Sequence, residues 1–167
     1  GVGVSPYALA GLTGSTTYQF YVRQICGEEV GPWSAASSFT TALINDNIAG
    51  ALPVTCGQTY TGSTATATND EPNPAIFGVG ATLSPNVWYS FTGTGTPELV
   101  SLNFCASGYD TAVLVATGTP GALTYVAGND DSGTGGVCVS TTRSYVEFTS
   151  DGTTTYYSMV RGYGVFS

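Results

Sequence analysis

Short stretches of the sequence alternate hydrophobic and polar residues, which is the pattern of half-buried β-strands. In the first 42 residues such stretches lie at 7–9, 17–23 and 36–41, with glycine-containing turns between them. Alternation in the middle stretch places Tyr18, Phe20 and Val22 on one face. We therefore predict three strands here, with these side chains facing a core.

From residue 43 onward, similar stretches recur at about the spacing of strands in a β-sandwich. No stretch combines the 3.6-residue helical period with helix-forming residues, and no internal repeat is visible. A hydrophobic fraction of 42% is sufficient for a packed core. We expect an all-β fold, with strands in this second part at 58–60, 86–91, 99–105, 112–117, 123–126, 144–148 and 155–161.

Charge narrows the possible functions. The chain has 11 acidic and 3 basic residues, no histidine, and no lysine, since all three basic residues are arginines. It therefore lacks the side chains of Schiff-base, Ser-His-Asp and Cys-His catalysis, and we expect no enzyme activity. A net charge of -8 argues against nucleic acid as a partner, because phosphate binding needs an excess of basic residues. No apolar run reaches the roughly 20 residues of a membrane helix, so we expect no membrane insertion.

The cysteines indicate the compartment. Cys26, Cys56, Cys105 and Cys138 contain no Cys-x-x-Cys pair, which argues against a zinc or redox motif and favours an oxidised, secreted or cell-surface protein. The sequence leaves all three pairings open, as well as the alternative of four buried free thiols. The chain starts at Gly1 without an initiator methionine or a signal region, so we expect a processed chain or a piece of a longer protein.

The first 42 residues carry landmarks of a known domain. The run from Leu12 to Tyr18 has the spacing of the turn before a tyrosine corner, in which the tyrosine hydroxyl bonds to the backbone. Together with Trp33-Ser34 and the closing Phe39-Thr-Thr41, this run resembles the C-terminal half of a fibronectin type III domain. The resemblance implies a partial sandwich of about three strands over residues 1–42, whose apolar face needs a cover.

Residues 43–167 carry a second ordered set of landmarks. The set resembles the bacterial pre-peptidase C-terminal domain, a secreted β-sandwich. This implies a jelly-roll-like antiparallel β-sandwich whose last strand, expected after Gly162-Tyr-Gly164, is missing. The landmarks are Asn45-Asp46, Cys56-Gly57, Gly62-Ser-Thr64, Ala67-Thr68, Glu71-Pro72, Val87-Trp-Tyr-Ser-Phe91, Tyr109-Asp110-Thr111, Asn129-Asp130-Asp131, Gly152-Thr-Thr-Thr-Tyr156 and Arg161-Gly-Tyr163.

Several acidic residues cluster at predicted turns, and two interpretations of them stay open. Asn and Asp are ordinary turn residues that bond their own backbone. Clustered oxygen ligands are also what calcium requires. The resemblance implies Asn45 and Asp46 as calcium ligands at the domain entrance. Asp110, Asp130 and Asp131 form a second candidate group, since neighbouring strand ends often meet at one rim of a sandwich.

Aromatic residues suggest a carbohydrate-binding platform, with Trp33, Trp88, Tyr109 and Tyr163 as candidates. For Trp88 the strand pattern favours a place in the core. Asp110-Thr111-Ala112 also resembles a short O-glycosylation acceptor, although the domain landmark explains these residues better.

We therefore expect a non-catalytic module of a secreted or cell-surface protein that serves adhesion, attachment or extracellular assembly. A sharper form of this expectation is a filament subunit, in which strands from a neighbouring copy complete the partial sandwich. The alternative is an accessory domain of a secreted protease or glycanase that binds substrate or carbohydrate. The expected partners are other copies of the chain, neighbouring domains, and a polysaccharide or protein matrix.

Overall fold

The structure is a computed structural model that describes residues 7–71, 74–81 and 83–164. Its contacts divide the chain into two compact units, Gly1–Leu43 and Ile44–Ser167. The regular elements of the described residues are β-strands and one short 3-10 turn, η1 (Ile48–Gly50), which confirms the all-β prediction. None of the described helical residues forms a segment long and apolar enough to cross a membrane.

The first unit is built on one hairpin that contains two small sheets of two short strands each. β1 pairs with β4 and β2 with β3, both antiparallel, so the two small sheets follow each other along one hairpin. The predicted strand at 7–9 is wrong, because this segment pairs with no strand of the described residues and forms no ladder. The strands are β1 (Thr17–Phe20), β2 (Ile25–Cys26), β3 (Glu29–Val30) and β4 (Ser37–Thr40).

The hairpin places Tyr18 and Phe20 on one face as predicted, but the other described residues of this unit do not cover that face. Tyr18 and Phe39 are register partners with ring centroids 5.9 Å apart, and Phe20 lies 6.3 Å from Phe39. Phe20 is nevertheless 44% exposed and Val22 61% exposed. No described residue of this unit is classed as buried. An isolated two-stranded hairpin is at best marginally stable in water, so this face needs a cover.

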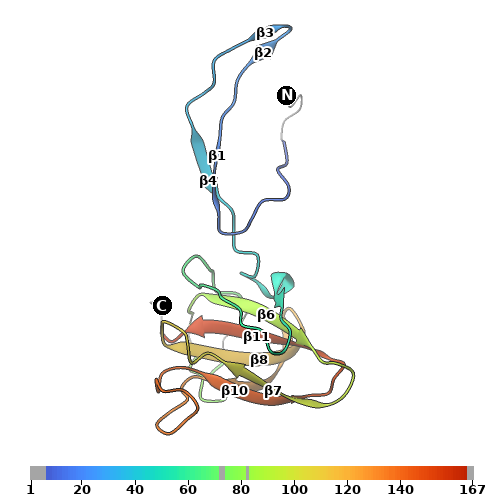
Figure 1. Ribbon diagram of the computed structural model, residues 1–167, viewed down its shortest axis with the longest axis vertical. Coiled ribbons are helices and arrows are strands. Elements are labelled where there is room, and N and C mark those ends of the chain that lie inside the picture. The colour runs from blue at the N-terminus through green and yellow to red at the C-terminus, as the bar shows by residue number, and fades with distance from the viewer. Residues whose placement is uncertain (1–6, 72–73, 82, 165–167) are drawn as a thin grey trace. The chain divides into compact units, whose positions relative to one another are not determined.

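The second unit contains two sheets (Figure 1). One has the strand order β5-β6-β11-β8-β9 and the other consists of β10 and β7; only the β5–β6 pair is parallel. All strands expected from residue 86 onward are present, whereas 58–60 is not a strand and the two-residue β5 was not predicted. The strands are β5 (Leu52–Pro53), β6 (Asn86–Thr92), β7 (Glu98–Asn103), β8 (Thr111–Thr119), β9 (Ala122–Asn129), β10 (Tyr145–Ser150) and β11 (Thr155–Gly162).

The core of this unit lies on the central strands of the five-stranded sheet. Met159 on β11 is the register partner of Trp88 on β6 and of Leu114 on β8, and all three side chains are at most 1% exposed. Ile48 and Val79 pack against this cluster from outside the sheet. The prediction that Trp88 belongs to the core is confirmed, and Trp88 cannot serve as a surface platform.

Three tyrosines cap turns in the same way. In each turn the backbone N–H of a residue donates to the hydroxyl of the tyrosine five positions later, and each tyrosine follows a threonine. The first of these bonds is the tyrosine corner predicted from the sequence, which is confirmed. The donor and acceptor residues are Thr13 and Tyr18 (2.9 Å), Thr55 and Tyr60 (3.0 Å), and Asp151 and Tyr156 (3.1 Å).

Candidate metal centre

The β8–β9 hairpin brings three carboxylates together. Asp110 immediately precedes β8, and Asp130 and Asp131 immediately follow β9. Because the two strands are antiparallel, with Val113 opposite Asn129, the start of β8 and the end of β9 lie at the same end of the sheet. One carboxylate oxygen from each aspartate lies within 4.8 Å of the other two. The predicted convergence of these residues, hereafter the Asp triad, is confirmed.

Buried hydroxyl groups fix the backbone beneath the Asp triad. Ser144 and Thr111 are both fully buried, and the Ser144 N–H donates to the Thr111 hydroxyl at 2.8 Å. The Ser144 hydroxyl donates to the backbone carbonyl of Asp130, also at 2.8 Å. On the other side, the Tyr163 N–H donates to the backbone carbonyl of Asp110 at 3.0 Å. The main chain at Asp110 and at Asp130 is therefore held independently of the carboxylates.

The carboxylates lie in an environment that penalises their negative charge. Burial raises the pKa of Asp110, and the nearby Asp131 raises it further, against the opposing effect of Arg143. Burial likewise raises the pKa of Asp130 to about 6, with added repulsion from Asp131 and Asp110 and an opposing attraction from Arg161. A bound cation would relieve this repulsion directly.

Two carboxylate oxygens of the Asp triad lack protein partners. Oδ1 of Asp110 and Oδ1 of Asp130 are shielded from solvent and accept no hydrogen bond within the described part of the chain. Buried polar atoms in native proteins nearly always have a partner, so such atoms call for an explanation such as an ion or an ordered water. Oxygen atoms of this kind are the preferred ligands of hard cations. The Asp triad can therefore hold a metal ion.

Two arginines compensate part of the charge. Arg161 on β11 is only 1% exposed, and its guanidinium donates to the backbone carbonyl of Gly80. Arg143 donates from Nε to the carbonyl of Ser107 at 2.7 Å and from Nη1 to the Thr142 hydroxyl at 3.0 Å. The positive charge of Arg143 opposes the rise in the pKa of Asp110, and that of Arg161 opposes the rise in the pKa of Asp130.

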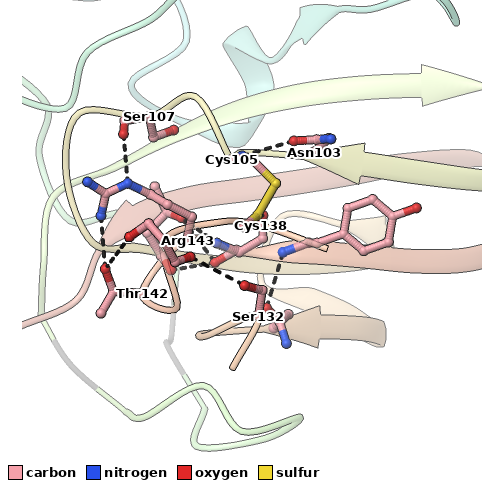
Figure 2. The surroundings of a disulfide bond; sticks show 12 residues. Asn103, Cys105, Ser107, Ser132, Cys138, Thr142 and Arg143 are labelled. Atoms are coloured by element: carbon pink, nitrogen blue, oxygen red, sulfur yellow. Dashed lines mark hydrogen bonds between the residues drawn. A yellow bond between two sulfur atoms is a disulfide. The ribbon is translucent and has the colours of Figure 1, made fainter. Parts of the chain in front are cut away.

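A disulfide joins the two loops that carry the Asp triad (Figure 2). Cys105 lies in the loop that leads to Asp110, and Cys138 lies in the loop that follows Asp131; their Cα atoms are 4.9 Å apart. The bond from Arg143 to Ser107 connects the same two loops, as Figure 2 shows. The structure pairs Cys105 with Cys138 and leaves Cys26 and Cys56 as exposed free thiols, so the alternative of four buried free thiols is wrong. The disulfide indicates an oxidising compartment.

The other two predicted ligands, Asn45 and Asp46, have structural partners. Asn45 is 5% exposed; its side-chain amide donates to the Trp88 carbonyl at 3.1 Å, and its own carbonyl accepts from the Trp88 N–H at 2.9 Å. Asp46 accepts from the backbone N–H and from the hydroxyl of Thr68. In the described residues Asp46 belongs to no group of three metal-ligating side chains. These two residues attach the start of the second unit to the sandwich.

The structure also decides the weaker sequence signals. Thr111 is fully buried and hydrogen-bonded to Ser144, so its hydroxyl is not accessible for O-glycosylation in the folded protein. Of the remaining platform candidates, Trp33 is 59% and Tyr163 53% exposed, whereas Tyr109 is half-buried. The landmark residue Pro72 lies outside the described residues.

Ser144 and Arg161 are the site residues that sequence reasoning missed. Arg161 was only a family landmark, and its position on an otherwise hydrophobic, buried strand was the available signal, since a buried charge needs a compensating partner. No protein-family model matches the chain, and searches of curated proteins and of solved structures also find no match. The function is therefore argued from the residues themselves.

Proposed function

We propose that this chain is a non-catalytic module of a secreted or cell-surface protein that serves adhesion, attachment or extracellular assembly, and that calcium bound at the Asp triad stabilises its second unit. The observation that carries the proposal is the convergence of Asp110, Asp130 and Asp131, two of which have a shielded oxygen without a protein partner. A cation that binds only the folded state stabilises it by mass action.

The donor set favours calcium over other common metals. The Asp triad offers carboxylate oxygens and no imidazole or thiolate, which disfavours zinc and copper. Calcium accepts six to eight oxygen ligands in flexible geometry, so water and backbone carbonyl groups can complete a set of three carboxylates. Magnesium needs a stricter octahedral arrangement and keeps most of its waters.

Secretion is supported by the disulfide and by the two domain resemblances. Cys105 and Cys138 are paired, as expected for a chain that folds in an oxidising environment. Fibronectin type III and pre-peptidase C-terminal domains accompany other domains in long extracellular chains, and the sequence lacks lysine and histidine for most side-chain catalysis. A module for attachment or assembly fits these features together.

Assembly into a filament is the sharper form of this proposal. The hairpin of the first unit leaves Phe20 and Val22 exposed and presents strand edges, so strands from a neighbouring copy can complete it. Size-exclusion chromatography with light scattering tests this form. Oligomers at micromolar concentration support it, and a stable monomer contradicts it.

An accessory role in a secreted protease or glycanase is the second candidate. It is favoured by the exposed aromatic side chains of Trp33 and Tyr21 on the first unit. Pull-down of the chain with insoluble polysaccharide or collagen separates this role from self-assembly, since a filament subunit would sediment without added polymer.

The calcium part of the proposal is tested by thermal unfolding. Saturation at about 100 times the Kd adds about 2.7 kcal/mol, which corresponds to a rise of about 5–10 °C in Tm. We expect this rise between EDTA and millimolar calcium in the natural chain and not in Asp110→Asn or Asp130→Asn. Glu28→Gln removes one exposed carboxylate of the other unit and should keep the rise. Equal Tm values of the natural chain in EDTA and calcium would overturn the calcium site.

A further inference from the structure

One region of the first unit's hairpin combines aromatic, amide and guanidinium groups. Gln19 lies on β1, and Tyr21 and Arg23 follow the end of that strand at Phe20. An open hollow of about 600 Å³ is lined by Gln19, Phe20, Tyr21, Trp33 and Ser34, and Arg23 adjoins it through its contact with Trp33. The Trp33 side chain is 59% exposed and that of Tyr21 50% exposed, so both rings are accessible.

The side chains around the hollow are held in place. The Tyr21 hydroxyl donates to the side-chain oxygen of Gln19 at 3.3 Å, which leaves the Gln19 amide N–H groups as donors. The guanidinium carbon of Arg23 lies over the Trp33 ring, 4.4 Å from its centroid, which is cation–π distance. Ser34 joins the Trp33 segment to the opposite strand, because its N–H donates to the Val22 carbonyl at 2.7 Å and its hydroxyl accepts from the Val22 N–H at 3.1 Å.

We propose that this hollow binds an oligosaccharide that ends in a carboxylated pyranose. Exposed aromatic rings offer flat apolar surfaces for a sugar ring, while a few polar groups fix its orientation. A guanidinium group that lies over an aromatic ring can still make a bidentate contact with one carboxylate, and Arg23 lies over Trp33. Arg23 forms no ion pair with a carboxylate of the described residues, so this charge is available to a ligand.

The distribution of charged residues favours a ligand with a single carboxylate over a polyanionic ligand. Arg23 is the only basic residue among the first 43, whereas the whole chain carries a net charge of -8 that repels polyanions. The nearest acidic residues in sequence, Glu28 and Glu29, lie at the hairpin turn, and Glu29 pairs with Cys26. Cys26 lies three positions after Arg23, which corresponds to about 10 Å of extended chain. This distance is close to the screening length of about 8 Å in physiological salt.

This inference names a partner for the attachment role proposed above and rests on it. Its test uses the full chain and calorimetric titration with a trisaccharide that ends in glucuronic acid. We expect binding that weakens at least tenfold when the carboxylate is methyl-esterified or when Arg23 is replaced in Arg23→Gln, and that weakens with added salt. Arg23→Lys, which keeps the charge and loses the planar fork, should give an intermediate affinity. Tyr7→Ala, which removes an exposed aromatic side chain of the same unit, should bind normally.

Equal binding of the acid and its methyl ester, or an unchanged affinity in Arg23→Gln, would overturn the site. It is also overturned if a peptide with a C-terminal glutamate binds as tightly, because recognition is then of the carboxylate and not of the sugar. Stronger binding of polygalacturonate per carboxylate would contradict the selection of a single charge. The calcium-dependent rise in Tm depends on the other unit, so the two proposals fail separately.

Discussion

The hydroxyl of Thr111 accepts a hydrogen bond from the backbone N–H of Ser144 at 2.8 Å, although the two residues are 33 positions apart. Thr111 begins β8 in the five-stranded sheet, and Ser144 directly precedes β10 in the two-stranded sheet. Because the Ser144 hydroxyl also contacts the carbonyl of Asp130, this pair connects both sheets to the backbone of the Asp triad.

Replacement of this serine should destabilise the second unit. Ser144→Ala removes the hydroxyl partner of the Asp130 carbonyl at a fully buried position, which costs about 1–3 kcal/mol of unfolding free energy. Urea denaturation measures the loss. Ser38→Ala, at an exposed position of the first unit, is the matched control and should change stability by less than about 0.5 kcal/mol. Equal values for both variants would contradict the structural role of Ser144.

The raised pKa of Asp130 predicts a pH dependence in the absence of metal. Between its ordinary value of 3.8 and its value of about 6 in the folded protein, the folded state keeps a proton that the unfolded state has lost. The titration of Asp130 therefore makes the free energy of unfolding fall as pH rises from about 4 to about 6. Above that range Asp130 no longer changes the free energy of unfolding with pH. Asp110, whose pKa is also raised, contributes in the same direction.

Urea denaturation in EDTA across this pH range checks the effect. Asp130→Asn should flatten the decline, whereas Glu28→Gln should keep it. Calcium binds the ionised carboxylates, so its affinity should rise over the same range in the natural chain. A decline that is identical in the natural chain and in Asp130→Asn would assign the slope to other groups.

Reduction of the disulfide should destabilise the second unit. Cys105 and Cys138 are 33 residues apart, and closure of a loop of this size stabilises the folded state by roughly 3–4 kcal/mol in the chain-entropy model. Denaturation with and without dithiothreitol measures the difference. Cys56→Ser removes an exposed free thiol and should leave the effect unchanged, whereas a Cys105→Ala and Cys138→Ala double variant should show no further response to reductant.

The sequence predicted those features that depend on local alternation. The pattern around Trp88 identified a strand and its core residue, and the positions of Asp110 and Asp130 at strand ends indicated their convergence. The strand predictions at 7–9 and 58–60 were wrong, because a strand also needs a neighbouring strand to pair with, and the local sequence does not reveal that partner. The roles of Ser144 and Arg161 depend on burial, which arises only when distant strands pack together.

Removal of the tyrosine hydroxyl from one of the three turn caps should lower the free energy of unfolding, and the loss should be larger where the tyrosine is less exposed to solvent. Tyr156→Phe leaves the Asp151 N–H without its partner at a tyrosine that is only 7% exposed, so we expect a loss of about 1–3 kcal/mol in unfolding free energy. Tyr60→Phe removes an equivalent bond at a tyrosine that is 45% exposed, where water can replace the hydroxyl, and should cost less than about 0.5 kcal/mol. Both variants report on the same unit, so one urea titration series compares them directly. Equal losses would show that burial does not set the strength of these caps.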